Sequence, residues 1–314
     1  MGTADQYPRE GLQRMKALIT GGSGFTGREL QRHLTAMNDD VVVVDRTSTG
    51  LDITNREAVM AAIADAKPDV VYHLAAQAHV PTAWDDPVTT MRCNVEGTLN
   101  VLDAADRAGA GRVILASSAD VYGSVEESAL PIDESTEARP NNPYAASKLA
   151  AEALAIQSFH GRGQDVIRLR VFNAVGPGQR PEFACSGIAH RIAAAESANT
   201  SEIQVGRLDV RRDFIDIRDV VRAYRLAAVA GRPGAVYNVC SGTDRSIEEI
   251  AHGLAQHSSQ DVHFTVETEH LRPVDTPVVR GNAAAISTDT GWSTEIPFET
   301  TLIDVLEDAR KALA

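Results

Sequence analysis

The fold of this chain is decided by the stretch Lys16-Ala17-Leu18-Ile19-Thr20-Gly21-Gly22-Ser23-Gly24-Phe25-Thr26-Gly27. Its first five residues form an apolar run typical of a buried strand, and from Phe25 to Met37 apolar residues recur at roughly helical spacing. Gly21 permits a tight turn, Gly24 lets the backbone approach an anion, and Gly27 allows close packing of helix on strand. Because a helix N-terminus presents unpaired N–H groups, this turn predicts a cradle for a dinucleotide pyrophosphate.

The end of the next apolar run bears on which dinucleotide is bound. Residues 41–44 are all valine and are followed by Asp45. An acidic residue about twenty positions after the glycines is placed to bind the ribose 2′-hydroxyl of NAD. Arg46 follows directly, and a guanidinium there would suit the 2′-phosphate of NADP. The sequence therefore predicts NAD or NADP and leaves both open.

The composition excludes several other classes of protein. The 314 residues are 43% hydrophobic and 23% charged, which is ample for one large α/β unit and a smaller lobe. The net charge of −13 argues against a nucleic-acid partner, because neutralising phosphates requires a basic surface. No apolar run approaches the roughly 20 residues of a membrane span, and the N-terminus lacks the apolar core of a signal peptide. Cys93, Cys185 and Cys240 lack metal-ligand spacing and suit reduced thiols, so we expect a cytoplasmic protein without a metal site.

Strand-like and helix-like segments alternate along the first half of the chain. The segments are residues 41–45, 55–66, 70–74, 88–108, 112–117 and 165–171, with one long helix expected between 88 and 108. Such alternation is typical of right-handed βαβ units and of a parallel sheet covered on both faces. We expect residues 15–172 to bind the cofactor, with returns to the sheet near 214–240. Residues 173–314 would mainly form a substrate lobe, and residues 1–14 a disordered extension.

Tyr144 and Lys148 form the second informative pair. They are four residues apart and therefore share one face of a predicted helix. One positive charge at ~4 Å, with an effective dielectric constant near ~20, supplies about 4 kcal/mol. That is enough to lower the pKa of a tyrosine from about 10 to about 7. We expect Lys148 to have this effect on Tyr144 and, together with the glycine loop, the pair indicates a redox enzyme.

These features resemble the extended short-chain dehydrogenase/reductase family that acts on nucleotide sugars, over nearly everything from Met15 to Ala314. The matching segments are the glycine loop, His73-Leu74-Ala75-Ala76, Asn94-Val95-Glu96-Gly97-Thr98, Ser117-Ser118-Ala119-Asp120-Val121-Tyr122-Gly123, the Tyr144/Lys148 pair and Arg212-Asp213-Phe214. The resemblance implies a Rossmann-type doubly wound sheet, a smaller discontinuous C-terminal substrate lobe and a homodimer.

Three further segments narrow the resemblance within the family. They are Phe172-Asn173 with Gly176-Pro177-Gly178-Gln179, Val236-Tyr237-Asn238-Val239-Cys240-Ser241-Gly242, and Leu271-Arg272-Pro273 with Thr290-Gly291-Trp292. They are most similar to members that reduce GDP-linked 4-keto sugars. The resemblance implies NAD(P)H-dependent reduction of the C4 ketone of GDP-4-keto-6-deoxy-mannose to GDP-6-deoxy-mannose (GDP-D-rhamnose).

The resemblance also implies roles for single residues. Tyr144 would donate a proton to the substrate oxygen, Ser118 would orient that oxygen, and Lys148 would also hold the ribose hydroxyls. Asn94 would complete the set through backbone or water contacts. The implied cofactor contacts are Gly21, Ser23, Gly24, Phe25, Thr26, Gly27, Asp45, Arg46, Asp52, Ile53, Leu74, Ala75, Ala76, Tyr144 and Lys148.

Substrate binding is expected to centre on the diphosphate of a nucleotide sugar. Arg212 and Arg272 match family positions at which guanidinium groups clamp the phosphates, and Asn173 matches an asparagine that contacts them. Ser118 would contact the sugar, and His79 belongs to a loop that faces the expected cleft.

Asp120 leaves the reaction open. Related 4,6-dehydratases carry a glutamate two residues after the serine or threonine, where it removes the C5 proton. Asp120 stands at that position with a shorter reach, and a base acts only within hydrogen-bond distance. We favour reduction, with GDP-mannose 4,6-dehydratase and NDP-hexose 4-epimerase as alternatives. A cofactor-binding sensor or scaffold is the non-enzymatic alternative, against which the intact Ser118, Tyr144 and Lys148 argue.

Overall fold

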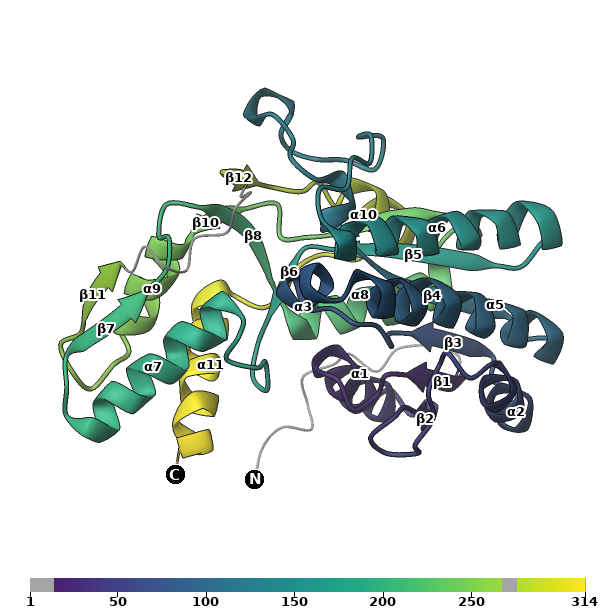
Figure 1. Cartoon of the computed structure of the whole chain (residues 1–314), viewed down its shortest axis with the longest axis horizontal. Helices are drawn as coiled ribbons and strands as arrows, with labels where there is room; N and C mark the ends of the chain where they lie inside the picture. Colours follow the sequence, from purple (N-terminus) through teal and green to yellow (C-terminus); the bar gives the residue numbers. More distant parts are fainter. Residues whose placement is uncertain (1–13, 267–275, 314) are drawn as a thin grey trace.

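The central element of the molecule is a six-stranded parallel sheet, seen at the right of Figure 1 in a computed structural model that describes residues 14–266 and 276–313. The strands are β1 (Lys16–Thr20), β2 (Asp40–Val44), β3 (Val70–His73), β4 (Arg112–Ser118), β5 (Val166–Val171) and β9 (Val236–Val239). Their order is β2-β1-β3-β4-β5-β9, and all neighbours are parallel. The expected Rossmann-type sheet is confirmed.

The strand order reverses between β1 and β3, and folds of this kind form a ligand-binding crevice there. The chain passes from β1 to β2 on one side and returns to β3 on the other, so the strand order reverses there. Thr20, Val44 and His73 are in register at the carboxyl edge. Ligands of such folds bind at this edge where the order reverses.

Helices cover both faces of the sheet. On one face lie α1 (Phe25–Ala36), α8 (Ile217–Ala230) and α10 (Ala284–Thr290), and on the other α2 (Arg56–Ala66), α5 (Gly97–Ala108) and α6 (Pro143–Arg162). Successive strand residues alternate between the two layers, so Leu18 packs under α2 and α5 whereas Ile19 packs under α1 and α8. Both layers are apolar, which explains why the strands are apolar throughout.

The long helix expected between residues 88 and 108 is confirmed, and it contains a π-helical turn that the sequence did not predict. The segment consists of α4 (Pro87–Met91), the π-helical turn η1 (Arg92–Glu96) and α5, and is preceded by α3 (Val80–Asp85). In η1 the side-chain amide of the buried Asn94 donates to Ser147 Oγ of α6 at 2.8 Å, and the backbone carbonyl oxygen of Asn94 accepts from the Thr98 hydroxyl at 2.6 Å. Single π turns are frequent at functional sites, and this one lies against the helix that carries Tyr144.

The second lobe lies at the left of Figure 1 and has its own core. Its elements are β6 (Asn173–Val175), α7 (Ala184–Ala198), β7 (Glu202–Val205), β8 (Arg211–Asp216), β10 (Asp244–Ser246), α9 (Ile247–Ala255), β11 (His263–Val266), β12 (Val278–Val279) and α11 (Phe298–Leu313). Strand β8 pairs with β6, β10 and β12, and β7 pairs with β11.

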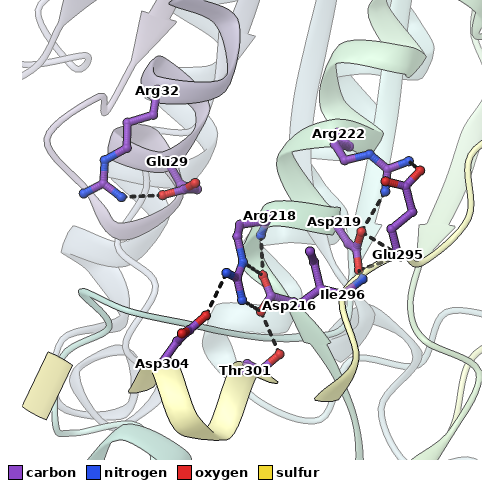
Figure 2. A network of polar contacts seen from close by, with 10 residues as sticks. All are labelled: Glu29, Arg32, Asp216, Arg218, Asp219, Arg222, Glu295, Ile296, Thr301 and Asp304. Atoms are coloured by element: carbon purple, nitrogen blue, oxygen red, sulfur yellow. Dashed lines mark hydrogen bonds and ion pairs between the residues drawn. The ribbon is translucent and has the colours of Figure 1, made fainter. Parts of the chain in front are cut away.

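A polar network ties the C-terminal helix α11 to the start of α8 (Figure 2). Asp216 caps α8 by accepting from the Arg218 N–H at 2.8 Å, and it also accepts from the Thr301 hydroxyl of α11 at 2.7 Å. Arg218 pairs with both Asp216 and Asp304 at 2.7 Å. Since α8 packs on the central sheet, this network fixes the second lobe to it. No helix within residues 14–266 and 276–313 has the length and apolarity needed to cross a membrane.

Candidate active site

The glycine loop and the end of β3 form the floor of the crevice. Gly21 has a positive φ of 73°, and a Cβ there would lie 2.7 Å from the backbone nitrogen of Ala75. A Cβ on Gly27 would lie 2.6 Å from Gly22 Cα, so the helix could not pack so closely on the turn. Helix α1 begins after Gly24, which has no side chain to cap it. The N–H groups of its first turn therefore face the crevice, and this cradle fits a dinucleotide pyrophosphate.

The other predicted cofactor residues near this floor are held by short hydrogen bonds. The Thr20 hydroxyl contacts His73 Nδ1 at 2.7 Å and accepts from the Ala75 N–H at 3.3 Å. This places Leu74, Ala75 and Ala76 directly beside the glycine loop, with Phe25 and Thr26 opening α1 on its other side. Burial lowers the pKa of His73 to about 3, with a further contribution from the charge of Lys148, so this imidazole is neutral.

The Asp45 carboxylate faces the glycine loop. Oδ2 accepts from the N–H and hydroxyl of Ser23, both at 2.8 Å, and Oδ1 accepts from the N–H groups of Thr47 and Ser48 at 2.8 and 2.7 Å. Burial raises the pKa of Asp45, but these hydrogen bonds outweigh it and lower the pKa to about 2. Four donors fill the acceptor sites of a carboxylate. The expected bond to a ribose hydroxyl would therefore have to displace one of them.

Arg46, Asp52 and Ile53 occupy different environments. The Arg46 side chain is 81% exposed and lies 3.7 Å from Asp52, a pair that contributes little in water. Asp52 Oδ1 accepts from the N–H of Thr54 at 2.9 Å. Ile53 is buried against Gly97, so its side chain belongs to the core. Of these three residues, Arg46 presents the exposed cationic group at the end of β2.

Ser118 and Tyr144 meet at the carboxyl end of β4. Helix α6 begins after Asn142, whose side chain accepts from the Ala145 N–H at 2.8 Å, and this cap fixes Tyr144 in the first turn. Ser118 is hydrogen-bonded to the Tyr144 phenol and accepts from the Asp120 N–H at 3.1 Å. Tyr144 and Ser118 are each 9% exposed, whereas Asp120 is exposed. A proton donor and a second hydroxyl thus lie together at the crevice.

The expected lowering of the Tyr144 pKa by Lys148 is wrong. Burial raises the pKa of Tyr144 well above its ordinary value and the charge of Asp120 adds to this, while the Ser118 hydrogen bond opposes it. Lys148 donates from Nζ to the carbonyl oxygen of Ala116 at 2.9 Å, and its nitrogen lies 5.9 Å from the centre of the Tyr144 ring. Four-residue spacing placed both side chains on one face, but it could not show that the lysine turns toward β4.

Asn94 and His79 lie near the Ser118 and Tyr144 hydroxyls, and the polar groups of both residues already make hydrogen bonds. The Asn94 amide donates to Gln77 O at 2.9 Å and to Ser147 Oγ at 2.8 Å, and its oxygen accepts from the Gln77 N–H at 2.8 Å. Asn94 therefore ties the loop after β3 to α6. The His79 ring contacts the Thr82 hydroxyl at 2.9 Å at the start of α3, which packs against α6.

The predicted substrate residues of the second lobe line a cavity of about 310 Å³. Asn173 opens β6, and Arg212 lies on the adjacent β8, where its Nη1 donates to the carbonyl oxygens of Arg211 and Thr276 at 2.8 and 2.7 Å. Arg191 and Arg207 also line the cavity, and no motif in the sequence identified them. Three guanidinium groups make the cavity suitable for a diphosphate. Arg272 lies outside the described residues.

The described residues contain no cluster of three or more His, Cys, Asp or Glu side chains arranged to hold a metal ion. The residues that could hold a cofactor are those of the glycine loop, the end of β2 and the end of β3. The site therefore combines a dinucleotide cradle, a buried hydroxyl pair and a cationic cavity.

Comparison with known proteins places these features in a family. A model of the NAD dependent epimerase/dehydratase family matches residues 17–240. GDP-6-deoxy-D-mannose reductase of Pseudomonas aeruginosa is 38% identical over 93% of this chain and 96% of its own length. A dTDP-glucose 4,6-dehydratase of Streptomyces niveus is 29% identical over 93% of this chain and 92% of its own. Among solved structures, RMD from Pseudomonas aeruginosa complexed with NADPH has a TM-score of 0.89 and 37% identity, covering 96% of this chain and 100% of the other.

Proposed function

The chain belongs to the NAD-dependent epimerase/dehydratase family, and we propose that it reduces the C4 ketone of GDP-4-keto-6-deoxy-mannose to GDP-6-deoxy-mannose (GDP-D-rhamnose). The observation that carries this proposal is the buried Tyr144 phenol, hydrogen-bonded to Ser118 and held in its protonated form. A ketone becomes an alcohol by gaining a hydride at carbon and a proton at oxygen. The bound NADH or NADPH supplies the hydride.

The residues of the chain supply the rest of the reaction. The Ser118 hydroxyl donates a hydrogen bond to the ketone oxygen and orients it, and the Tyr144 phenol gives that oxygen its proton. Lys148, fixed by the Ala116 carbonyl, is a positive charge beside the same crevice and favours the negative charge that develops on the oxygen.

The state of Tyr144 favours reduction over the alternatives. A 4,6-dehydratase and a 4-epimerase both begin by oxidising the C4 alcohol, and this step needs a base that takes the hydroxyl proton. Burial and the charge of Asp120 disfavour the phenolate of Tyr144, so this base is costly to form. A reductase starts with the phenol and has no such cost. Asp120 itself is short and exposed, which does not suit removal of a C5 proton inside a closed site.

The contacts of Asp45 favour NADPH over NADH. The carboxylate already accepts four hydrogen bonds from Ser23, Thr47 and Ser48, which leaves no acceptor for a ribose 2′-hydroxyl. The exposed Arg46 guanidinium adjoins it and can pair with a 2′-phosphate. The relative solved as a complex with NADPH supports the same preference.

We propose the following organisation for the chain. Residues 15–172, with returns near 214–240, bind the cofactor, and residues 173–314 mainly bind the nucleotide diphosphate through the arginine-lined cavity. The three cysteines are free thiols, which supports a cytoplasmic location.

A homodimer is proposed from the apolar surface of neighbouring helices. Helices α3, α4 and α5 pack against α6, and these four helices expose large apolar side chains. The side chains are Trp84, Val88, Met91, Leu99 and Ile156. A second copy of the chain would cover them.

The activity is tested by mixing the purified protein with GDP-4-keto-6-deoxy-mannose and NADPH or NADH and following the absorbance of the reduced cofactor. We expect loss of that absorbance, faster with NADPH. GDP-mannose with NAD or NADP tests the dehydratase and a panel of UDP-sugars tests the epimerase. A sensor or scaffold would bind cofactor in the same samples without turnover.

A further inference from the structure

A buried ion pair lies directly behind the proton-transfer site. Glu152 follows Lys148 by one turn of α6, and both its carboxylate oxygens accept from Arg170 of β5, at 2.9 and 2.7 Å. The Glu152 side chain is 1% exposed and that of Arg170 is 8% exposed. The Ser117 hydroxyl of β4 donates to the same carboxylate at 2.5 Å. The carboxylate is therefore fixed in place from two neighbouring strands.

Arg170 is held on its other side as well. Its Nη1 donates to the Tyr122 hydroxyl at 3.0 Å, and its guanidinium lies 4.8 Å from the centre of the Tyr122 ring. The Tyr122 hydroxyl in turn donates to Asn238 Oδ1 of β9 at 2.7 Å. Every polar group in this chain of contacts is paired, so the network is rigid. At its other end the network reaches Ser117 through the Glu152 carboxylate, and Ser117 directly precedes Ser118.

The titratable groups that act on Lys148 lie on α6 itself, on η1 and on β3. Burial lowers the pKa of Lys148 to about 8, and the Cys93 and Glu152 side chains act to raise it. Burial raises the pKa of the Cys93 thiol of η1, and the charge of Lys148 acts to lower it. His73 of β3 is neutral, and β4 offers the Ala116 carbonyl. Among the described groups, Glu152 is therefore the carboxylate that acts, together with Cys93, against the effect of burial on Lys148.

We infer that Glu152 is a positioning residue of the proton-transfer site, which keeps Lys148 charged and holds β4 in place behind Ser118. Its carboxylate touches neither Tyr144 nor the crevice and acts through Lys148 and Ser117. The effect of Glu152 on turnover rests on the proposed function, but the charge on Lys148 can be measured without any substrate.

The test is an NMR titration of the lysine side chains. The chain contains four lysines, Lys16, Lys67, Lys148 and Lys311. Protein labelled with ¹³C at lysine Cε gives one signal for each, and Lys148→Met identifies the signal of Lys148. We expect this signal to titrate with a midpoint near 8 in the unchanged protein. In Glu152→Gln the midpoint should fall by about one pH unit, as expected when one charge about a helical turn away is removed.

Two further variants separate charge from packing. Ser117→Ala removes a hydrogen bond to Glu152 but keeps its charge, so the Lys148 midpoint should stay within about 0.3 of the unchanged protein. If Glu152→Gln leaves Arg170 unpaired and does not fold, Glu152→Gln combined with Arg170→Met removes the ion pair as a whole. The Lys148 midpoint should then fall less than in the single variant, because a positive charge is lost together with the negative one.

Two results would overturn the inference. In one, the Lys148 midpoint stays unchanged in the folded Glu152→Gln variant. In the other, it falls by as much in Ser117→Ala as in Glu152→Gln. Both results are read on protein without substrate. They therefore differ from a failure of the proposed activity, which would appear as absent turnover in an unchanged protein whose Lys148 titrates as expected.

Discussion

The Lys148 ammonium lies 5.9 Å from the centre of the Tyr144 ring and donates to the Ala116 carbonyl oxygen at 2.9 Å. The two side chains share one face of α6, yet the lysine is bonded to the sheet. Each group is governed chiefly by its own burial, which raises the pKa of Tyr144 and lowers the pKa of Lys148 to about 8. Near pH 7 the site therefore holds a neutral phenol and a charged ammonium, the two states that a ketoreductase needs.

Replacing Tyr144 with phenylalanine removes the proton donor and leaves the ring in its buried position. We expect the turnover number to fall by roughly 10²–10⁴-fold, the usual contribution of a general acid. Binding of NADPH, measured by fluorescence titration, should change little because the glycine cradle is untouched. Turnover within a few-fold of the unchanged enzyme would mean that the proton comes from another group.

The pH dependence of the reaction should follow Lys148. Its pKa is lowered to about 8 in the folded chain, so it is charged below that pH and loses its proton above it. We expect kcat/KM for reduction to be flat from about pH 6 to about pH 7.5 and to fall about tenfold per pH unit above about pH 8. An enzyme that first needs the Tyr144 phenolate would show the opposite slope. Stopped-flow rates across this range distinguish the two.

Asp120→Asn separates reduction from elimination. A reductase removes no C5 proton, and loss of the Asp120 charge lowers the pKa of Tyr144 toward the working pH. We expect turnover of the 4-keto sugar within about threefold of the unchanged enzyme. A dehydratase that used Asp120 as its base would lose about two to four orders of magnitude. Steady-state kinetics of both proteins measure the difference.

Asp45→Asn tests how far Asp45 supports the glycine loop. The folded-state pKa of Asp45 is lowered from 3.8 to about 2, so its charged form stabilises the fold above about pH 4. This stabilisation, about 2 kcal/mol, is lost as the pH falls from about 4 toward about 2. Urea unfolding should show the variant to be less stable at pH 7, with the difference narrowing below about pH 4. A difference that does not change with pH would point to a loss of packing instead.

The sequence predicted those parts of the fold and site that depend on local pattern. The glycine turn between β1 and α1 and the alternating elements follow from spacing and residue type. Ser118 was assigned beside Tyr144 from the family resemblance. The π turn at Arg92–Glu96 was missed because its residues continue a helical pattern, and only packing on α6 reveals it. The direction of Lys148 and the two donors that Ser23 offers to Asp45 depend on segments that are distant in the sequence. The other two donors to Asp45, the N–H groups of Thr47 and Ser48, are local.

The cavity lined by Arg191, Arg207 and Arg212 in the second lobe also could not be predicted in full from the sequence. Arg212 could be assigned because it stands in a motif, but Arg191 and Arg207 come from α7 and from the segment between β7 and β8. Nothing in their local sequence marks them as neighbours. Their proposed function as phosphate ligands depends on how β7 and β8 bring the two segments to one cavity.

The most direct test of the account is to follow hydrogen into the product. NADPH carrying deuterium at the transferred position is incubated with GDP-4-keto-6-deoxy-mannose, and a second sample uses unlabelled NADPH in deuterium oxide. Reduction predicts deuterium at C4 of GDP-6-deoxy-mannose in the first sample and no enzyme-dependent deuterium at C5 in the second. Rapid deuterium incorporation at C5 during turnover, abolished by Asp120→Asn, would contradict reduction and establish elimination chemistry at this site.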